Sequence, residues 1–517
     1  MAIKLSKSEI ILLLTLFLVA FLLRIFPLLQ NNLSFHFDMS RDAFVAEQIW
    51  KNFDVKIQGP ATSTAGLFHG VLYYYLIAPF YAISQGNPWF VSLVLAFINS
   101  TTVLPLYLLG RSFFKSVKWG LLVTVLFVSS FEAIQYGPWL SNPQPAVLTS
   151  AWFFYFLYQW IQGRKSAFIM VCIFAALSMQ FQFFLLYLFF VILITPFLFK
   201  LSIKPSQLVL GLIVISVILS TMIASVFSFG GPLQTISSLS AFSDTKGSLD
   251  ANFTDLMLLY INNLSKVFTN NLFPLNVFIG GIVFLVTTIW LVIKKELFIL
   301  LGIFSSLIMF FFGGHSNVYA NIALVPPTLL GFVYLIKSIS LKYKPLVMVI
   351  LVGVMISNFY MTIKAIPRGQ YLLVIQPDMI LRNQLALVDQ TYLLSDGKPF
   401  AINSLTVPLW TNTTWAYLYH YYGYKKYGYV PTFYGNDPVG SLGADVVKKS
   451  AGKDEIKFFI VEPLKGIPGN ITDSEFEKEK GNTTLIKEYN YGQNRLQQRQ
   501  NNTKEASDSA QSGQENN

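Results

Sequence analysis

Long apolar runs alternate with short polar connections along this chain, and no other feature constrains its fold more. A helix that crosses a bilayer needs about 17 to 25 predominantly apolar residues. Such runs recur at 8–29, 89–113, 118–137, 146–162, 166–181, 183–200, 206–229, 274–293, 296–313, 318–337 and 345–363. The pattern therefore predicts an α-helical polytopic membrane protein with about eleven transmembrane helices.

Composition supports this class and excludes others. Only 12% of the 517 residues are charged, whereas soluble globular domains carry about 25%. The net charge of +11 does not indicate a nucleic-acid partner, because the lysines and arginines of the first 363 residues fall mainly in short connections between apolar runs. The single cysteine, Cys172, lies inside such a run, so the chain forms no internal disulfide.

The distribution of basic residues among the connections fixes the predicted topology. Lys4 and Lys7 place the N-terminus in the cytoplasm. The apolar stretch 68–84 is ambiguous, and if it crossed, every later basic connection would lie outside. If it lies along the outer interface, as its tyrosines favour, the basic connections are all cytoplasmic. We therefore expect a multi-pass plasma membrane protein with its C-terminal region outside the cytoplasm.

Three segments are then long enough to form structure on the outer side: 30–88, the Asn/Ser-rich 230–273, and the region after 363. Within 364–496, a helical pattern at 378–393 and β-like runs at 400–403 and 457–461 predict a small extracytoplasmic α/β domain. The tail 497–517 lacks apolar residues other than alanine, so we expect it to be disordered.

The first outer segment carries the most unusual polar run, Asp38-Met-Ser-Arg41-Asp42. On a helix Asp38 and Asp42 share a face, because positions i and i+4 do. A carboxylate there can accept a proton from an acceptor group or hold a metal ion. Alternatively, Asp38 or Ser40 caps the helix that follows and Asp42 complements its N-terminal end.

Further polar groups fall on the outer side of the predicted bundle. Each taken alone is most simply explained by ordinary helix-end or interfacial chemistry, and snorkelling to headgroups is the simplest expectation for the arginine. Together they indicate binding or chemistry at the outer leaflet. They are Arg24, His69, Asn142, Gln144, Gln182 with its neighbour Gln180, and His315.

No nucleotide-binding loop, zinc-protease motif, paired cysteine motif or hydrolase nucleophile elbow occurs in the sequence. A nucleotide-driven reaction therefore has no visible site on the cytoplasmic side. An enzyme of the outer leaflet would more plausibly use a donor that is already in the membrane, such as a lipid-linked one.

With these residues in view, residues 8–340 resemble the membrane glycosyltransferases of the GT-C fold that use polyprenyl-phosphate sugars. These include the protein O-mannosyltransferases and the aminoarabinose transferase of lipid A, and the prokaryotic mannosyltransferase-like branch is the most similar. The matches are Arg24 before an acidic motif, the 68–74 stretch with His69, the turn of Asn142 and Gln144, and the helix end at Gln180–Gln182. The sequence departs from the family in three places, one of which is that the turn at Asn142 lacks the acidic residue that some members carry. The family's acidic pair is adjacent whereas Asp38 and Asp42 are not, and His69-Gly-Val replaces a basic residue followed by two prolines.

The resemblance implies an inverting transfer from a polyprenyl-phosphate sugar to an unknown extracytoplasmic acceptor, with Asp38 as general base. Arg41, His69 and Arg24 would stabilise the departing phosphate, and the outer domain would cover the site or recognise the acceptor. The remaining predicted substrate-binding residues are Asp42, Asn142, Gln144, Gln182 and His315. No cofactor is implied with certainty, and a divalent cation stays an open alternative.

Two other functions remain open. A lipid-sugar flippase or transporter would carry polar groups through the middle of its spans and related broken helices. The sequence shows few mid-span charges, of which Glu132 is the nearest. An inactive scaffold whose outer domain binds a partner is the second alternative, because the acidic motif departs from the family pattern.

Overall fold

The protein divides into two compact units. The first comprises Met1–Leu33 and Val45–Leu373, and the second Ser34–Phe44 and Val374–Asn517. The computed structural model describes residues 5–62, 67–228, 230–231, 233–234, 237, 253–310, 318–370, 372–373, 376, 378–435, 442–451 and 456–502. The sequence predicts a C-terminal domain that begins near residue 364. The C-terminal unit also contains residues 34–44, which are eleven residues of the predicted first outer segment.

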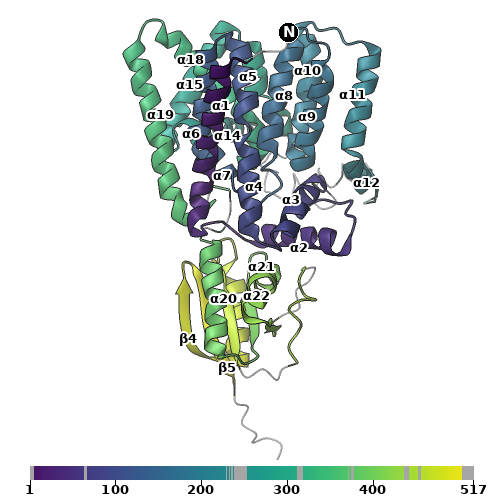
Figure 1. Cartoon of the computed structure of the whole chain (residues 1–517), viewed down its shortest axis with the longest axis vertical. Coiled ribbons are helices and arrows are strands. Elements are labelled where there is room, and N and C mark those ends of the chain that lie inside the picture. The colour runs from purple at the N-terminus through teal and green to yellow at the C-terminus, as the bar shows by residue number, and fades with distance from the viewer. Residues whose placement is uncertain are drawn as a thin grey trace, which may run out of the picture. The chain divides into compact units, whose positions relative to one another are not determined.

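The first unit is a helical bundle (Figure 1). Its elements, in chain order, are α1 (Lys7–Ile25), η1 (Phe26–Gln30), α2 (Phe37–Asn52, which begins in the second unit), α3 (Leu72–Ile83), α4 (Pro88–Ser100), α5 (Val103–Phe114), α6 (Val117–Ser129), α7 (Phe131–Tyr136), α8 (Ala146–Ile161), α9 (Ala167–Phe181), η2 (Phe183–Leu186), α10 (Tyr187–Phe199), α11 (Pro205–Ile218), α12 (Ser220–Ser228), α14 (Phe253–Leu272), α15 (Val277–Lys294), α16 (Leu297–Ile303), α17 (Leu307–Phe310), η3 (Val318–Leu324), α18 (Val325–Ser340), α19 (Lys344–Ala365) and η4 (Ile366–Arg368).

The helices begin and end where the sequence supplies caps. Helix α1 starts with a capping box, in which Ser6 Oγ accepts the Glu9 N–H at 3.3 Å and Glu9 Oε2 accepts the Ser6 N–H at 2.8 Å. Helix α15 starts at Asn276, whose side chain accepts the backbone N–H of Ile279. It ends at Lys295, which takes a left-handed conformation with φ of 56°.

The predicted spans coincide with helices in the described residues. Among the described residues, five helical segments are long and apolar enough to cross a membrane, or six if the pair α11 and α12, bent by 63°, counts as one span. The other expected spans correspond to shorter helices, so length and composition alone do not establish all eleven crossings. The protein is nevertheless a membrane protein by the criteria of length and hydropathy.

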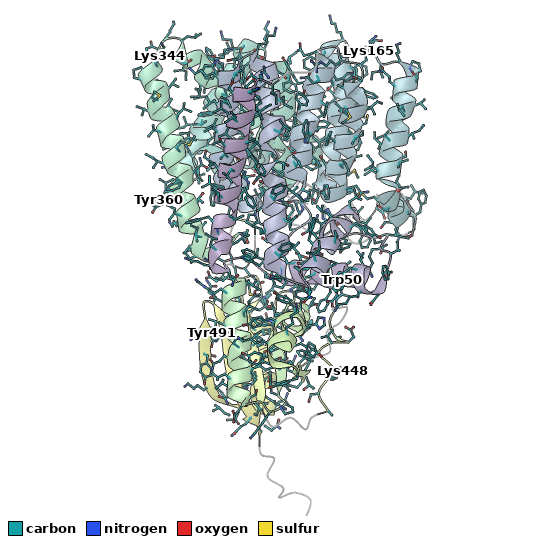
Figure 2. All side chains as sticks on the ribbon, in the orientation of Figure 1. Trp50, Lys165, Lys344, Tyr360, Lys448 and Tyr491 are labelled. Carbon is teal, nitrogen blue, oxygen red and sulfur yellow. The ribbon has the colours of Figure 1, made fainter. Side chains whose placement is uncertain are left out.

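The basic connections gather at one end of the bundle. Arg111 Nη1, at the end of α5, lies 2.9 Å from Glu9 Oε1 in the first turn of α1. Gln207 at the start of α11 donates to the Lys165 carbonyl at 3.1 Å. Figure 2 shows Lys165 and Lys344 at the end of the bundle where Figure 1 marks the N-terminus. The predicted topology requires this grouping, because it places all of the basic connections on the same side of the membrane.

Helix α3, the ambiguous stretch at 68–84, has 12 residues. At 1.5 Å per residue it is about 18 Å long, well short of the roughly 30 Å of a hydrocarbon core. It lies at the end of the bundle opposite the N-terminus (Figure 1). These observations agree with the predicted interfacial role.

The segment 230–273 departs from the expectation of an outer polar loop. Its second half forms α14, a 20-residue helix with Asn263, Thr269 and Asn271 buried. Gly280 of α15 lets the two helices approach closely, because a Cβ at that position would lie 2.7 Å from Thr269 Cα. Sequence reasoning missed this helix because its asparagines lower the hydropathy of a segment that the bundle nevertheless buries.

The second unit is a mixed α/β domain. Its elements are α20 (Leu381–Ser395), β1 (Ala401–Leu405), α21 (Thr413–Leu418), η5 (Tyr419–Gly423), α22 (Tyr424–Tyr427), β2 (Thr432–Phe433), β3 (Lys457–Val461), α23 (Gly469–Asn482), β4 (Thr483–Tyr491) and β5 (Asn494–Asn501). The five strands form one sheet in the order β2-β1-β3-β5-β4. Strand β1 is parallel to β2 and β3, whereas β5 is antiparallel to β3 and β4.

The expected start of the disordered tail at residue 497 is wrong. Strand β5 continues to Asn501, and its register places Gln497 opposite Phe459 and Arg499 opposite Lys457. The run of Asn, Gln and Arg is polar, but its pairing with the buried strand β3 on one side and with β4 on the other holds it in the sheet. The residues after 502 lie outside the described part of the chain.

Candidate functional site

The acidic motif lies in the first turns of α2, within the second unit. Arg41 Nη1 donates to Asp38 Oδ1 at 2.7 Å, and Arg41 Nε and Nη2 donate to Asp42 Oδ1 at 2.9 and 2.7 Å. The Asp38 side chain is 52% exposed, whereas that of Asp42 is 2% exposed. The arginine thus joins an accessible carboxylate to a buried one, and Asp38 is the member that a substrate can reach.

The predicted cap is not formed by these residues. Helix α2 begins at Phe37, so Asp38 and Ser40 lie inside its first turn. The Ser40 hydroxyl donates to the Phe37 carbonyl at 2.9 Å, and is therefore not an N-cap acceptor there. It also lies 3.2 Å from the Thr414 hydroxyl of α21.

The C-terminal unit positions the motif through backbone contacts just before α2. The Phe35 N–H donates to the Met379 carbonyl at 2.8 Å, and the Gln384 amide donates to the Phe35 carbonyl at 2.8 Å. Ser34 and Ile380 form an antiparallel bridge. Contacts between residues almost 350 positions apart therefore hold the segment that precedes Asp38. A hydropathy pattern does not reveal such contacts.

Arg41 lies between the two carboxylates of the motif. The guanidinium of Arg41 binds Oδ1 of both Asp38 and Asp42. Among the residues that the structure describes, no three His, Cys, Asp or Glu side chains come together as ligands of one metal ion. We therefore assign no step to a metal.

Arg24, in the last turn of α1, is fully buried and does not snorkel. Its Nε donates to Asn99 Oδ1 at 2.6 Å and its Nη1 to the Ala20 carbonyl at 3.0 Å, while the guanidinium lies 4.9 Å from the Phe127 ring centroid. Its Nη2 has no hydrogen-bond partner among the described residues. A buried cation with an open donor is arranged to receive an anionic group.

The turn between α7 and α8 lies against this arginine. A Cβ on Gly137 would fall 2.5 Å from Arg24 Cγ, so the turn can pack on the side chain only because residue 137 is a glycine. Gln144 donates to the carbonyls of Gly137 and Leu95, at 3.0 and 2.7 Å. The same turn places Asn142, whose amide donates to the Phe181 carbonyl at 2.7 Å.

His69 contacts the junction between α9 and η2, which the Asn142 amide also contacts. Its Nδ1 accepts the Phe183 N–H at 3.1 Å, so in the neutral ring the other nitrogen, Nε2, carries the proton and can donate. Gly70 donates its N–H to the Gln180 carbonyl at 2.8 Å, and a Cβ at Gly70 would lie 1.7 Å from the Gln180 side chain. Only glycine allows this close approach.

Gln182 lies at this junction with no exposed surface. Neither its amide nitrogen nor its oxygen has a hydrogen-bond partner within the described ranges. The structure therefore brings His69, Asn142 and Gln182 together around residues 181–183, and Arg24 and Gln144 together around Gly137. The Asp38 motif belongs to the other unit, and His315 lies outside the described residues.

Sequence reasoning missed Asn99, the partner of Arg24, and gave too little weight to Glu132. Asn99 is 1% exposed and Glu132 is fully buried. A polar residue inside a long apolar run of the sequence was the available signal for both.

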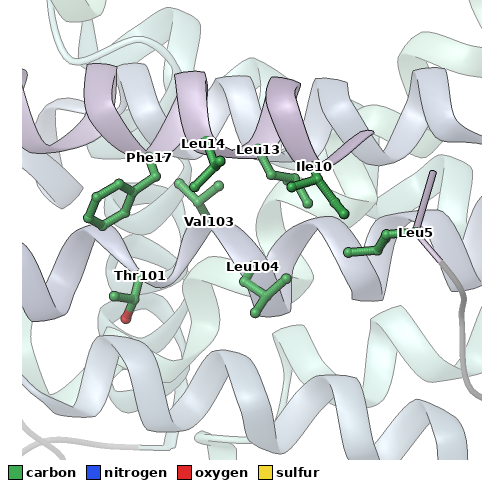
Figure 3. Close-up of a pocket in the computed structure, with 8 residues that line it drawn as sticks. All are labelled: Leu5, Ile10, Leu13, Leu14, Phe17, Thr101, Val103 and Leu104. Atoms are coloured by element: carbon green, nitrogen blue, oxygen red, sulfur yellow. The ribbon is translucent and has the colours of Figure 1, made fainter. Parts of the chain in front are cut away.

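The bundle also contains an apolar cavity of about 290 Å³ between the start of α1 and α5 (Figure 3). Apart from Thr101, its lining side chains are hydrocarbon: Leu5, Ile10, Leu13, Leu14, Phe17, Val103 and Leu104. It lacks the polar groups that chemistry requires, so it is not a candidate active site.

Comparison with known proteins establishes the fold. No protein-family model and no curated protein matches this chain. The crystal structure of ArnT from Cupriavidus metallidurans in the apo state matches with a TM-score of 0.54 at 9% sequence identity, over 95% of this chain and 98% of that one. ArnT bound to undecaprenyl phosphate matches with a TM-score of 0.54 at 10% identity, over 96% and 98%. The chain thus has the GT-C fold that the sequence resemblance implied.

Proposed function

We propose that this protein is an inverting glycosyltransferase that moves a sugar from a polyprenyl-phosphate donor to an extracytoplasmic acceptor. The observation that carries the proposal is the match over nearly the whole chain to ArnT, whose structure is known with undecaprenyl phosphate bound. Basic connections grouped at one end of the bundle support a cytoplasmic N-terminus, and hence an outer location for the polar turns.

Arg24 supplies the charge for the lipid phosphate in this proposal. A phosphate oxygen would satisfy the open Nη2, and a charge-assisted bond in a buried setting is stronger than one in water. The resemblance also gives His69 a role at the phosphate, and the neutral ring, with Nδ1 as acceptor, carries its proton on Nε2. Stabilising the negative charge that develops on the leaving phosphate lowers the barrier to transfer.

Asp38 is the proposed general base. The acceptor oxygen forms a bond to the anomeric carbon while the bond from that carbon to the phosphate oxygen breaks, so the configuration inverts. The proton of the acceptor passes to Asp38 and the electron pair stays on the lipid phosphate. Arg41 holds one oxygen of Asp38, which orients the carboxylate. Base catalysis of this kind contributes about 10²- to 10⁴-fold.

The test is a transfer assay with the full chain in lipid nanodiscs and a panel of polyprenyl-phosphate sugars. Asp38→Asn should lower turnover by about 10²- to 10⁴-fold while the lipid affinity is preserved. The matched control is Asp54→Asn, because Asp54 is a similarly exposed carboxylate of the same segment (48% against 52%). Full activity of Asp38→Asn would exclude the base assignment, and translocation of the lipid without transfer would favour the transporter alternative.

A further inference from the structure

Helix α7 and the turn after it place three polar side chains in the interior of the helical unit. Glu132 is 0% exposed, Tyr136 is 1% exposed and Trp139 is 4% exposed. Glu132 Oε1, the Tyr136 hydroxyl and the Trp139 indole N–H have no hydrogen-bond partner among the described residues. Buried polar atoms are nearly always paired in native proteins, so three open ones within eight residues of chain require an explanation.

Neighbouring residues hold the Glu132 carboxylate in place. Its Oε2 accepts the Asn271 amide at 3.1 Å, and Asn271 Oδ1 accepts the Ser130 hydroxyl at 2.7 Å. Asn271 also donates to the Val267 carbonyl of its own helix at 2.8 Å. Asn271 thus holds the carboxylate through Oε2, the Asn270 side chain lies beside it, and Oε1 has no hydrogen-bond partner among the residues that the structure describes.

Aromatic rings surround these open atoms. The Trp139 ring lies 5.8 Å from that of Tyr136 and 6.3 Å from that of Tyr319 in η3, measured between centroids. The Tyr136 hydroxyl lies near Glu132, Tyr319 and Tyr187. Tyr187, at the start of α10, is fully buried, and its hydroxyl has no hydrogen-bond partner within the described ranges. Four segments of the bundle thus converge on one polar, aromatic cluster.

This cluster is adjacent to the proposed phosphate site. Gly137 directly follows Tyr136, and it is the residue that packs against the Arg24 side chain. Tyr136 and Trp139 thus flank the glycine that packs against the Arg24 side chain.

We propose that Glu132, Tyr136 and Trp139 form the binding site for the sugar of the lipid-linked donor, with Tyr187 and Tyr319 as its aromatic walls. This inference rests on the proposed function, since it takes a polyprenyl-phosphate sugar as the donor. A carboxylate oxygen accepts from a sugar hydroxyl, an indole N–H donates to one, and a tyrosine hydroxyl can do either. A set of aromatic surfaces with a few fixed polar groups is the usual construction of a small-molecule site.

The test compares binding of two kinds of lipid to the full chain in nanodiscs: undecaprenyl phosphate alone, and undecaprenyl phosphate carrying glucose, mannose or galactose. We expect the wild-type protein to bind at least one sugar-bearing lipid about 10-fold more tightly than the bare lipid. Glu132→Gln and Tyr136→Phe should each remove that preference while the affinity for the bare lipid changes less than about twofold. Tyr107→Phe is the matched control, because this buried tyrosine bonds to Glu9 at the opposite end of α1 from Arg24.

Each outcome decides between the alternatives. Loss of the preference in Tyr136→Phe but not in Tyr107→Phe supports the inference even if Glu132→Gln fails to fold. A wild-type protein that binds bare and sugar-bearing lipids equally, or variants that keep the preference, would overturn it and leave the proposed function standing. No binding of either kind of lipid by the wild-type protein would overturn the proposed function and the inference with it.

Discussion

Two buried carboxylates, Glu462 in one unit and Glu132 in the other, are bonded differently. Glu462 of the α/β unit is 2% exposed, and both of its oxygens accept hydrogen bonds, from the Val407 N–H at 2.9 Å and the Trp415 indole N–H at 3.1 Å. Glu132 of the helical unit is equally buried, yet within the described residues only one of its oxygens is bonded.

The arginines repeat this difference. Arg41 donates to two carboxylates, whereas Arg24 has only neutral acceptors and an unused Nη2 within the part of the chain that the structure describes. An unsatisfied buried charge is expensive unless a ligand completes it. We therefore propose ligand binding for the open groups of the helical unit and a positioning role for the salt bridges of the acidic motif.

The largest expected effect separates the two arginines. Arg24→Gln should weaken the binding of undecaprenyl phosphate by about 100-fold, because it removes a charge-assisted bond worth about 3 kcal/mol. Arg41→Gln should change that affinity by less than about threefold, since the charge of Arg41 is already balanced by Asp38 and Asp42. Binding to nanodisc-embedded protein measures both. Equal losses in the two variants would contradict the distinction.

The next effect concerns pH. Burial raises the pKa of Glu462 from its ordinary value of 4.5 to about 7, partly offset by the bonds from Val407 and Trp415. The folded unit therefore binds a proton more tightly than the unfolded chain does. The stability that Glu462 contributes is complete below pH 4.5 and is lost as the pH rises to about 7. The change amounts to about 3 kcal/mol.

Glu462→Gln isolates this contribution, because it stays neutral over the whole range. The protection of the β3 amides against hydrogen exchange, measured in the full chain and corrected for the intrinsic exchange rate, should fall between pH 5 and pH 7.5 in the wild-type protein. This decrease of protection with pH should be smaller in the variant. Identical slopes would mean that Glu462 does not titrate in this window.

The smallest effect lies inside the acidic motif. Asp42→Asn should lower the free energy of unfolding by about 2 kcal/mol, because it leaves a largely buried guanidinium with a weakened partner. Asp38→Asn should lower it by less than about 1 kcal/mol, because that pair is half exposed. Thermal unfolding of both variants under one condition measures the contrast. Asp38→Asn as the more damaging change would reverse the roles given to the two carboxylates.

Hydropathy and charge, which are local properties, were sufficient to predict most of the helical unit. The apolar runs coincide with helices, and the basic connections meet at one end, as Arg111 beside Glu9 shows. The strand at 457–461 was also predicted, because a short β-branched and aromatic run is fully buried there. Helix α14 was missed because several of the residues on its buried face are polar. The disordered tail was predicted to begin too early, because residues 497–501 are ordered by strand pairing, which composition does not reveal.

The sequence by itself determined the class of the protein, its membrane helices and the polar residues worth testing, since burial in lipid selects residue types directly. Only the tertiary structure decided how those residues are used. It buried Arg24 instead of letting it snorkel, and it brought His69, Asn142 and Gln182 to one helix end. It also placed the Asp38 motif in the C-terminal unit, through backbone bonds to Met379 and Gln384. Such contacts join segments hundreds of residues apart, and their energy depends on three-dimensional packing that no local pattern encodes.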